Sequence, residues 1–173
     1  MQEIKVLIDE EKINNRITEL ANQIHDEFGD EEIILVCVLK GATYFTVDLS
    51  KKINSDNVLI DFVKAKSYGI GQRETSGEID FQLDLSENVE GRNVVIVEDI
   101  IDSGITMKYL VEHISAKKPK TLKICALLDK PSRRTEDIYI DYVGFTIDNL
   151  FVLGYGMDCD EKYRNLPYIG YVE

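Results

Sequence analysis

Three apolar runs constrain the fold of this chain more than any other feature of its sequence. They cover residues 33–39, 94–97 and 122–128, and all three are dominated by Val, Ile and Leu. A strand that is apolar on both faces has to be covered on both faces, as happens in a parallel sheet that lies between helices. The runs therefore predict the central strands of an α/β sheet.

Helical patterns and shorter strands alternate with these runs. Apolar side chains recur at helical spacing from residue 13 to residue 28, and Gly29 follows as a stop signal. Further helices are expected at residues 42–53 and 104–115, further strands at residues 58–63, 139–145, 151–153 and 168–172, and a helical turn at residues 160–165. This alternation predicts an open, mostly parallel sheet flanked by helices, with ligands bound at the carboxyl ends of the strands.

Length, charge and apolar content limit the size of the fold and its partners. The 173 residues suit a single domain over residues 1–173. A net charge of -12 argues against binding to nucleic acid, whose phosphates it would repel. No apolar stretch approaches the ~20 residues of a membrane span, and the N-terminus lacks a signal-peptide core. Three widely spaced cysteines suit a reducing compartment, so we expect a cytoplasmic protein without membrane partners.

Residues 66–77 differ in character from the segments on either side. They are rich in Gly, Ser and Thr and offer little to bury. A loop of this length in a compact domain is usually functional or disordered. We expect a mobile loop here, either as a lid over a reaction site or as a surface loop without a role.

The segment 94–106 carries the most specific signal in the chain. A β-branched strand is followed by the adjacent carboxylates Glu98 and Asp99, and a third carboxylate, Asp102, comes three residues later. A helix N-terminus with free N–H groups and nearby hydroxyls binds phosphate, and paired carboxylates accept hydrogen bonds from a sugar diol. The pattern predicts a phosphoribose cradle formed by Glu98, Asp99, Asp102, Ser103, Gly104, Ile105 and Thr106.

A plainer interpretation of the same segment has Asp102 and Ser103 as ordinary helix caps and the carboxylate pair as a solvated strand end. Each residue alone fits that interpretation, but the complete thirteen-residue pattern favours the cradle. Neither a Walker-type phosphate loop nor a Gly-x-Gly-x-x-Gly turn after a strand occurs in the chain.

The segment resembles the phosphoribosyl-pyrophosphate motif of the type I phosphoribosyltransferases, in the variant typical of the hypoxanthine-guanine branch. Similar short segments follow in the same order at residues 39–42, 66–68, 127–131, 151–155, 158 and 161–164. The resemblance implies the open sheet already expected, with a small base-binding hood formed by the terminal segments. It also implies a homo-oligomer, either a dimer or a tetramer.

The resemblance further implies a reaction in purine salvage. The phosphoribosyl group of 5-phosphoribosyl-1-pyrophosphate would pass to hypoxanthine or guanine, with Mg²⁺, to give IMP or GMP and pyrophosphate. Glu98 and Asp99 would hold the ribose hydroxyls directly or through the metal, and Asp158 would approach the metal through water. Asp102, near N7 of the base, would be the general base.

Other residues take roles in binding by the same resemblance. Leu39–Lys40 would be a cis peptide, and Lys40, Gly41 and Arg164 would bind pyrophosphate. Lys130 would donate to the purine O6, Phe151 would stack on the base, and the Val152 backbone would meet its exocyclic edge. In the loop, Ser67 would donate to a phosphate oxygen and Tyr68 would lie over the sugar.

Other functions are also compatible with this sequence pattern. The acid Asp129 beside Lys130 leaves the preference among hypoxanthine, guanine and xanthine open, whereas a lysine donor opposes the amine of adenine. An RNA-binding regulator on the same fold would need a basic face, which a net charge of -12 disfavours. A silent nucleotide-binding module is disfavoured by the intact set of Glu98, Asp99 and Asp102.

Overall fold

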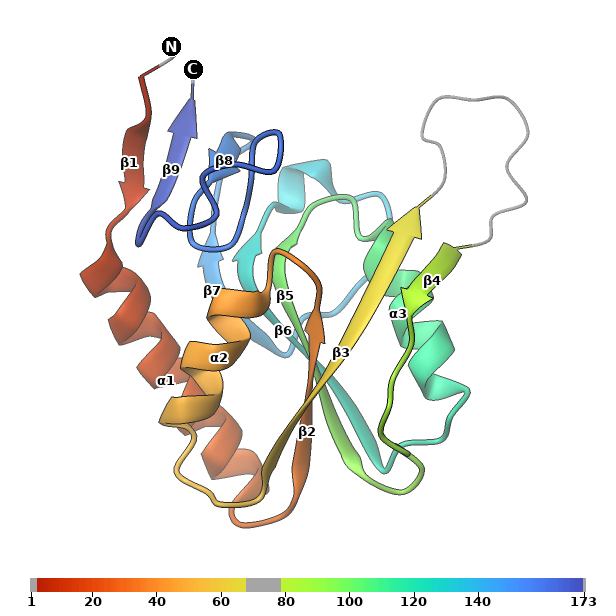
Figure 1. The fold of residues 1–173 in the computed structure, drawn as a ribbon. Coiled ribbons are helices and arrows are strands. Elements are labelled where there is room, and N and C mark those ends of the chain that lie inside the picture. The colour runs from red at the N-terminus through yellow and green to blue at the C-terminus, as the bar shows by residue number, and fades with distance from the viewer. Residues whose placement is uncertain (1–2, 68–78, 173) are drawn as a thin grey trace.

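The central element of the fold is a six-stranded sheet with the order β4-β3-β2-β5-β6-β7. A computed structural model describes residues 3–67 and 79–172 (Figure 1). The strands of this sheet are β2 (Ile33–Val38), β3 (Val58–Ser67), β4 (Ile79–Leu83), β5 (Asn93–Ile101), β6 (Thr121–Asp129) and β7 (Tyr142–Thr146). Every neighbouring pair is parallel except β3 with β4. The mostly parallel sheet expected from the apolar runs is confirmed.

Helices cover both faces of this sheet, which explains why its middle strands are apolar throughout. The helices α1 (Glu10–Phe28) and α2 (Thr43–Lys52) lie on one face, and α3 (Ile105–Ser115) lies on the other (Figure 1). All six residues of β2 are buried. They alternate between two core clusters, with Leu35 in the cluster under α1 and α2 and Val36 in the cluster under α3. No helix in the two described ranges is long and apolar enough to span a membrane.

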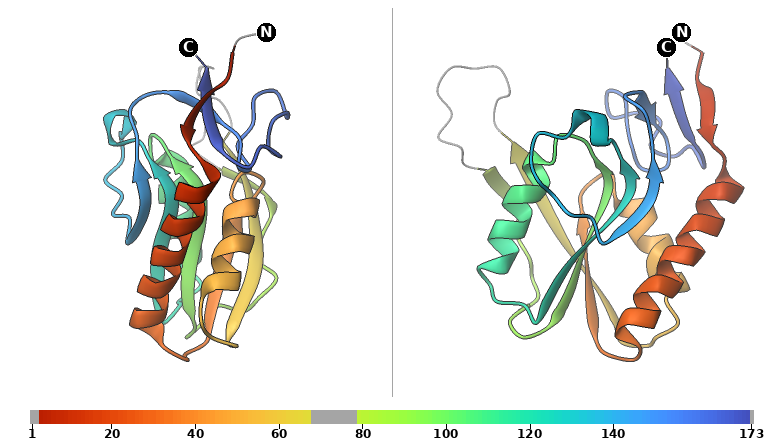
Figure 2. Two further views of the ribbon diagram at one scale, coloured as in Figure 1. Left: turned by 90° about the vertical axis from the view of Figure 1, so that its left-hand side faces the viewer. Right: turned by 180° about the vertical axis from the view of Figure 1, so that it is seen from behind.

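A second, three-stranded antiparallel sheet joins the two ends of the chain. It has the order β1-β9-β8, from β1 (Lys5–Ile8), β9 (Ile169–Val172) and β8 (Phe151–Leu153). The two termini lie side by side at this sheet, beyond the carboxyl ends of the central strands (Figure 2). It forms the hood expected from the terminal segments, although β1 was not among the predicted strands.

The structure corrects the expectation for residues 160–165. These residues form no helical turn, because Asp160, Glu161 and Tyr163 adopt left-handed backbone angles with φ of 52°, 61° and 71°. The segment instead folds back on itself through a β-bridge between Cys159 and Lys162. Arg164 therefore lies on a tight irregular loop.

The strand boundaries near the expected loop also differ from the prediction. β3 continues to Ser67 and pairs with β4 in antiparallel fashion, so Lys66 and Ser67 belong to a strand and β4 is an unpredicted element. The rest of the expected loop, including Tyr68, lies outside the described residues. On the far edge β7 begins only at Tyr142, because the side chain of Asp141 accepts a hydrogen bond from Ile124 N at 2.9 Å.

A buried carboxylate fixes the segment that follows β4 against β3. Asp61 is 4% exposed and accepts hydrogen bonds from the N–H groups of Phe62, Ser86 and Glu87 and from the Ser86 hydroxyl, at 2.8–2.9 Å. Burial raises the pKa of Asp61, but these hydrogen bonds outweigh burial and leave the pKa below its ordinary value. The ionised form is therefore part of the folded structure.

We expect Asp61→Asn to lower the free energy of unfolding by ~1–3 kcal/mol, because an amide cannot accept all of these hydrogen bonds. The contribution of the carboxylate is present above the unfolded pKa of about 4 and is lost as the pH falls through the lower folded pKa. Urea unfolding of wild type and variant at neutral and acidic pH measures this difference. Asp56→Asn, at an exposed position before the same strand, is the matched control, and an equal loss in both variants would contradict the role of Asp61.

Candidate active site

Three neighbouring strands of the central sheet deliver the predicted site residues to one edge. Lys40 and Gly41 follow β2, the segment from Glu98 to Asp102 ends β5, and Lys130 follows β6. β5 lies between β2 and β6, and both pairs are parallel, so the carboxyl ends of all three are adjacent. The structure thus brings these residues together where the α/β rule expects ligands.

Close contacts at Gly41 bring three segments together at this edge of the sheet. A Cβ atom on Gly41 would lie 1.9 Å from Oδ2 of Asp99, so the Asp99 carboxylate rests directly on the glycine. On the other side, a Cβ atom on Gly156 would lie 2.1 Å from the carbonyl oxygen of Gly41. The peptide between Leu39 and Lys40 is cis, as the sequence comparison implied. Three segments therefore meet at Gly41 with no space for a side chain.

Glu98 and Asp99 lie within the last part of β5 and not beyond its end. Glu98 is buried, and its Oε1 accepts a hydrogen bond from Asp99 N at 3.1 Å. Burial, together with the neighbouring charge of Asp99, raises the pKa of Glu98 well above its ordinary value. The interpretation of this pair as a solvated strand end is wrong for Glu98. A cation or a sugar diol would offset the cost of the paired acids.

The turn between β5 and α3 surrounds a small cavity of about 210 Å³. Gly104, with φ of 86°, precedes the first residue of α3, and Ser103 Oγ accepts a weak hydrogen bond from Ile105 N at 3.4 Å. The first N–H groups of a helix have no partner within the helix, so they are available to an anion. The cavity is lined by Glu98, Asp99, Ile100, Ile101, Asp102, Ser103, Gly104, Thr106 and Met107.

A segment after β6 braces this turn from outside. The carbonyl oxygen of Ser103 accepts hydrogen bonds from Thr135 N at 2.9 Å and Glu136 N at 3.2 Å, and Arg134 Nε donates to the carbonyl oxygen of Asp102 at 3.1 Å. Arg133 Nε lies 3.2 Å from Oδ1 of Asp102. Sequence reasoning missed both arginines, because nothing local in the chain connects them to a turn some thirty residues earlier.

Lys130 connects the end of β6 to the small sheet. Its side chain is buried, and Nζ donates to the carbonyl oxygen of Leu150 at 2.6 Å, directly before β8. Burial lowers the pKa of Lys130, although the charge of Asp102 acts in the opposite direction. Phe151 is 54% exposed at the start of β8, whereas Val152 is buried. The Phe151 ring is therefore open to solvent, directly after the residue whose carbonyl oxygen accepts from Lys130.

Two of the predicted pyrophosphate residues, Lys40 and Arg164, line a separate cavity of about 450 Å³, whereas Gly41 is not among its walls. Its walls are Leu39, Lys40, Lys64, Ala65, Gln82, Glu161 and Arg164. Arg164 Nη2 lies 2.8 Å from Oδ1 of Asp158, and Nη1 donates to the carbonyl oxygen of Gly156 at 2.7 Å. Lys64 on β3 was not predicted, because the expected strand ended at Val63 and a lysine beyond it carried no motif.

The predicted metal residues do not form a closed cage. Asp158 is engaged by Arg164, while Glu98 and Asp99 lie on β5. Among residues 3–67 and 79–172, no three His, Cys, Asp or Glu side chains gather as ligands for one ion. Mg²⁺ usually takes one or two carboxylates and completes its shell with water and substrate phosphates, and this arrangement fits that mode.

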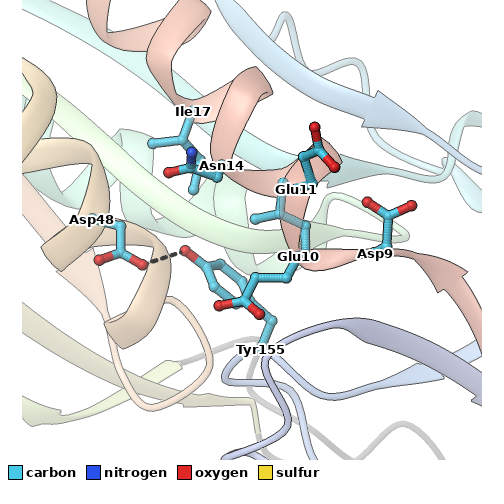
Figure 3. Close-up of a pocket in the computed structure, with 8 residues that line it drawn as sticks. Asp9, Glu10, Glu11, Asn14, Ile17, Asp48 and Tyr155 are labelled. Atoms are coloured by element: carbon cyan, nitrogen blue, oxygen red, sulfur yellow. Dashed lines mark hydrogen bonds between the residues drawn. The ribbon is translucent and has the colours of Figure 1, made fainter.

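A further cavity, of about 530 Å³, lies next to the N-terminus of α1 (Figure 3). One of its lining residues, Tyr155, helps to position the C-terminal segment. Tyr155 projects between α1 and α2, and its hydroxyl donates to Oδ2 of Asp48 at 2.7 Å (Figure 3). Burial and the hydrogen bond to Asp48 raise the pKa of Tyr155, so the phenol stays protonated. This contact ties the residue before Gly156 to α2, and so holds the C-terminal segment against Gly41.

Comparison with known proteins agrees with this geometry. The sequence model of the phosphoribosyl transferase domain matches residues 5–160. A hypoxanthine-guanine phosphoribosyltransferase from Bacillus subtilis is 48% identical over 166 residues, which cover 96% of this chain and 91% of that protein. A crystal structure of a hypoxanthine-guanine phosphoribosyltransferase from Bacillus anthracis has a TM-score of 0.93 at 50% identity, and the match covers 99% of this chain and all of that one.

Some relatives are much longer than this chain. The bifunctional protein TilS/HprT of Listeria monocytogenes is 48% identical over 166 residues, but the match spans only 25% of its length. These similarities extend over nearly the whole chain and agree with its fold. The chain belongs to the phosphoribosyl transferase domain family.

Proposed function

We propose that this protein is a hypoxanthine-guanine phosphoribosyltransferase that works in purine salvage in the cytoplasm. It would transfer the phosphoribosyl group of 5-phosphoribosyl-1-pyrophosphate to hypoxanthine or guanine and release pyrophosphate. The observation that carries the proposal is the meeting of a carboxylate pair, a phosphate-binding turn and a buried lysine at the carboxyl ends of β5 and β6. These three features match the diol, the 5′-phosphate and the 6-oxo group of one product nucleotide.

The sugar phosphate is held by β5 and the turn that follows it. Glu98 and Asp99 accept hydrogen bonds from the ribose hydroxyls, directly or through a metal ion. The 5′-phosphate lies in the cavity of the turn, where Ser103, Gly104, Ile105 and Thr106 offer N–H groups and hydroxyls at the start of α3. The brace from Thr135 and Glu136 fixes this turn before the ligand arrives.

The base lies between β6 and the small sheet. Lys130 donates to O6, the ring of Phe151 stacks on the purine, and the Val152 backbone meets the exocyclic edge. The acid beside the donor does not oppose this role, because the carboxylate of Asp129 forms an ion pair with Arg134. A lysine side chain offers donors and no acceptor, so Lys130 favours the carbonyl oxygen of a 6-oxopurine over the amine of adenine.

Chemistry takes place between the base and the leaving group. A purine nitrogen forms a bond to the anomeric carbon while the bond from that carbon to pyrophosphate breaks. Asp102 takes the proton of the imidazole ring at N7, and Arg133 holds its carboxylate in place from 3.2 Å away. Lys40, Arg164 and the backbone at Gly41 stabilise the charge that develops on pyrophosphate.

Mg²⁺ bound by Glu98, Asp99 and the substrate, with Asp158 acting through water, would neutralise charge on the diphosphate. The described residues supply these carboxylates but do not by themselves form a complete set of metal ligands. The raised pKa of Glu98 supports this role, since a neighbouring cation would favour its ionised form.

We also propose that the protein is a homo-oligomer, a dimer or a tetramer. Large apolar side chains are exposed on α2 and on the adjoining face of β3, where Tyr44, Val47, Ile60 and Phe62 are each 38–42% exposed. Exposed large apolar side chains on neighbouring elements are typical of a contact between proteins.

A xanthine-preferring enzyme is the second candidate for activity, and a panel of purine bases assayed with the sugar substrate distinguishes the two.

We expect Asp102→Asn to keep the fold and to lower kcat by about 10²-fold or more, because a positioned base contributes roughly 10²–10⁴-fold. Circular dichroism and binding of the product nucleotide provide the control for folding. Initial rates with saturating substrates give kcat. Wild-type turnover in the folded variant would remove Asp102 as the base.

We expect Lys130→Met to raise KM for hypoxanthine by about tenfold or more and to leave KM for the sugar substrate nearly unchanged. A buried carbonyl without its donor costs ~1–3 kcal/mol, whereas methionine keeps most of the side-chain volume. Steady-state kinetics with each substrate varied in turn measures both constants. An equal rise in the two KM values would assign Lys130 to folding or to the sugar site instead.

We expect activity to depend strictly on a divalent cation. Without one, Glu98, Asp99 and Asp158 would repel the negatively charged sugar substrate. Initial rates in excess chelator should fall to background and return when Mg²⁺ is added beyond the chelator. Transfer that persists at full rate in chelator would contradict this reading of the acidic residues.

A further inference from the structure

The cavity that would receive pyrophosphate carries three cationic side chains. Lys40 follows β2, Lys64 lies on β3, and Arg164 comes from the C-terminal loop. The N–H of Leu39, directly before the cis peptide, donates to the carbonyl oxygen of Val63 at 2.9 Å. This contact sets Lys64 beside the residues assigned to pyrophosphate.

One carboxylate of the protein already engages two of these cations. Oε2 of Glu161 lies 2.9 Å from Lys40 Nζ and 3.3 Å from Arg164 Nη2, so a single oxygen accepts from both. The hydrogen bonds from Lys40 and then from Arg164 lower the pKa of Glu161 below its ordinary value. A phosphate oxygen placed between the same two donors would make the same contacts.

Lys64 is different from its two neighbours. Its ammonium has no hydrogen bond or ion pair with any residue in the ranges 3–67 and 79–172, although it lines the same cavity. The cavity thus holds one cation without a counterion beside two that share an internal one.

We propose that Glu161 is a displaceable internal anion, which occupies Lys40 and Arg164 in the free protein and leaves when the diphosphate of the substrate arrives, while Lys64 attracts that diphosphate first. The proposal rests on the proposed function, because it assigns the cavity to pyrophosphate. It makes Glu161 a regulator of affinity at this cavity and adds Lys64 to the residues that bind.

Other contacts show that Glu161 is not needed to hold Arg164. The arginine is anchored by Asp158 and by the carbonyl oxygen of Gly156, and both contacts persist if Glu161 moves away. The Glu161 side chain is 66% exposed, so it can return to solvent at little cost. An incoming diphosphate brings several negative charges in place of one, which favours the exchange.

Binding of inorganic pyrophosphate with Mg²⁺ to the purified, full-length protein tests the proposal by calorimetry. We expect Glu161→Gln to tighten binding by about two- to tenfold, since an exposed ion pair that competes with the ligand is lost. Lys64→Gln should weaken binding to a similar extent. Asp160→Asn removes the same charge from the neighbouring exposed position, and asparagine also tolerates the left-handed backbone there, so it is the matched control and should change affinity less than twofold.

The sign of the change separates this proposal from a positioning role. Weaker or unchanged binding of pyrophosphate by Glu161→Gln and Glu161→Ala would overturn the proposal. If Glu161 positioned Lys40 and Arg164 for the ligand, its loss would lower the affinity. Equal tightening in Asp160→Asn would also overturn it, since general charge would then explain the gain. If Arg164→Gln binds pyrophosphate as wild type does, the assignment of the cavity fails, and the proposed pyrophosphate site fails with it.

Discussion

Gly41 is the point at which three segments of the proposed substrate site meet. The Asp99 carboxylate of β5 packs on one side of it and Gly156 of the C-terminal segment packs on the other, at distances that exclude any side chain. The hydroxyl of Tyr155, the residue before Gly156, stabilises this arrangement by a hydrogen bond to Asp48 of α2. The spacing between the acids and the cations of the proposed site therefore depends on one carboxylate and one backbone segment that both pack directly on Gly41.

The net charge of the chain does not predict the electrostatics of this site, because cationic and acidic side chains occupy separate parts of it. The chain carries a net charge of -12, yet three cationic side chains line one cavity, and Lys130 is a buried lysine at the end of β6. Two acids of the site are paired as well, Asp129 with Arg134 and Asp158 with Arg164. A negative net charge does not exclude a small anion in a cavity whose own lining is cationic.

Sequence patterns predicted those parts of the structure that local physics determines. Runs such as residues 33–38 must be buried on both faces, and the turn after β5 carries within a few residues the groups that are proposed to bind phosphate. Contacts between distant segments had no such signal. The brace of Arg134 on Asp102 joins residues 32 positions apart, and the left-handed angles at Asp160 and Glu161 depend on folding back toward Arg164, where composition alone suggested a helical turn.

The two halves of the site carry opposite kinds of electrostatic imbalance in the free protein. On β5, burial and then the neighbouring charge of Asp99 raise the pKa of Glu98 well above its ordinary value. Across Gly41, Lys64 lacks a counterion among the described residues, and Lys40 and Arg164 share Glu161. In the proposed function, a ligand that combines a diol, a cation and a diphosphate would relieve both imbalances, but only in one orientation. The charges assigned to substrate binding would then also decide which end of the substrate faces the base.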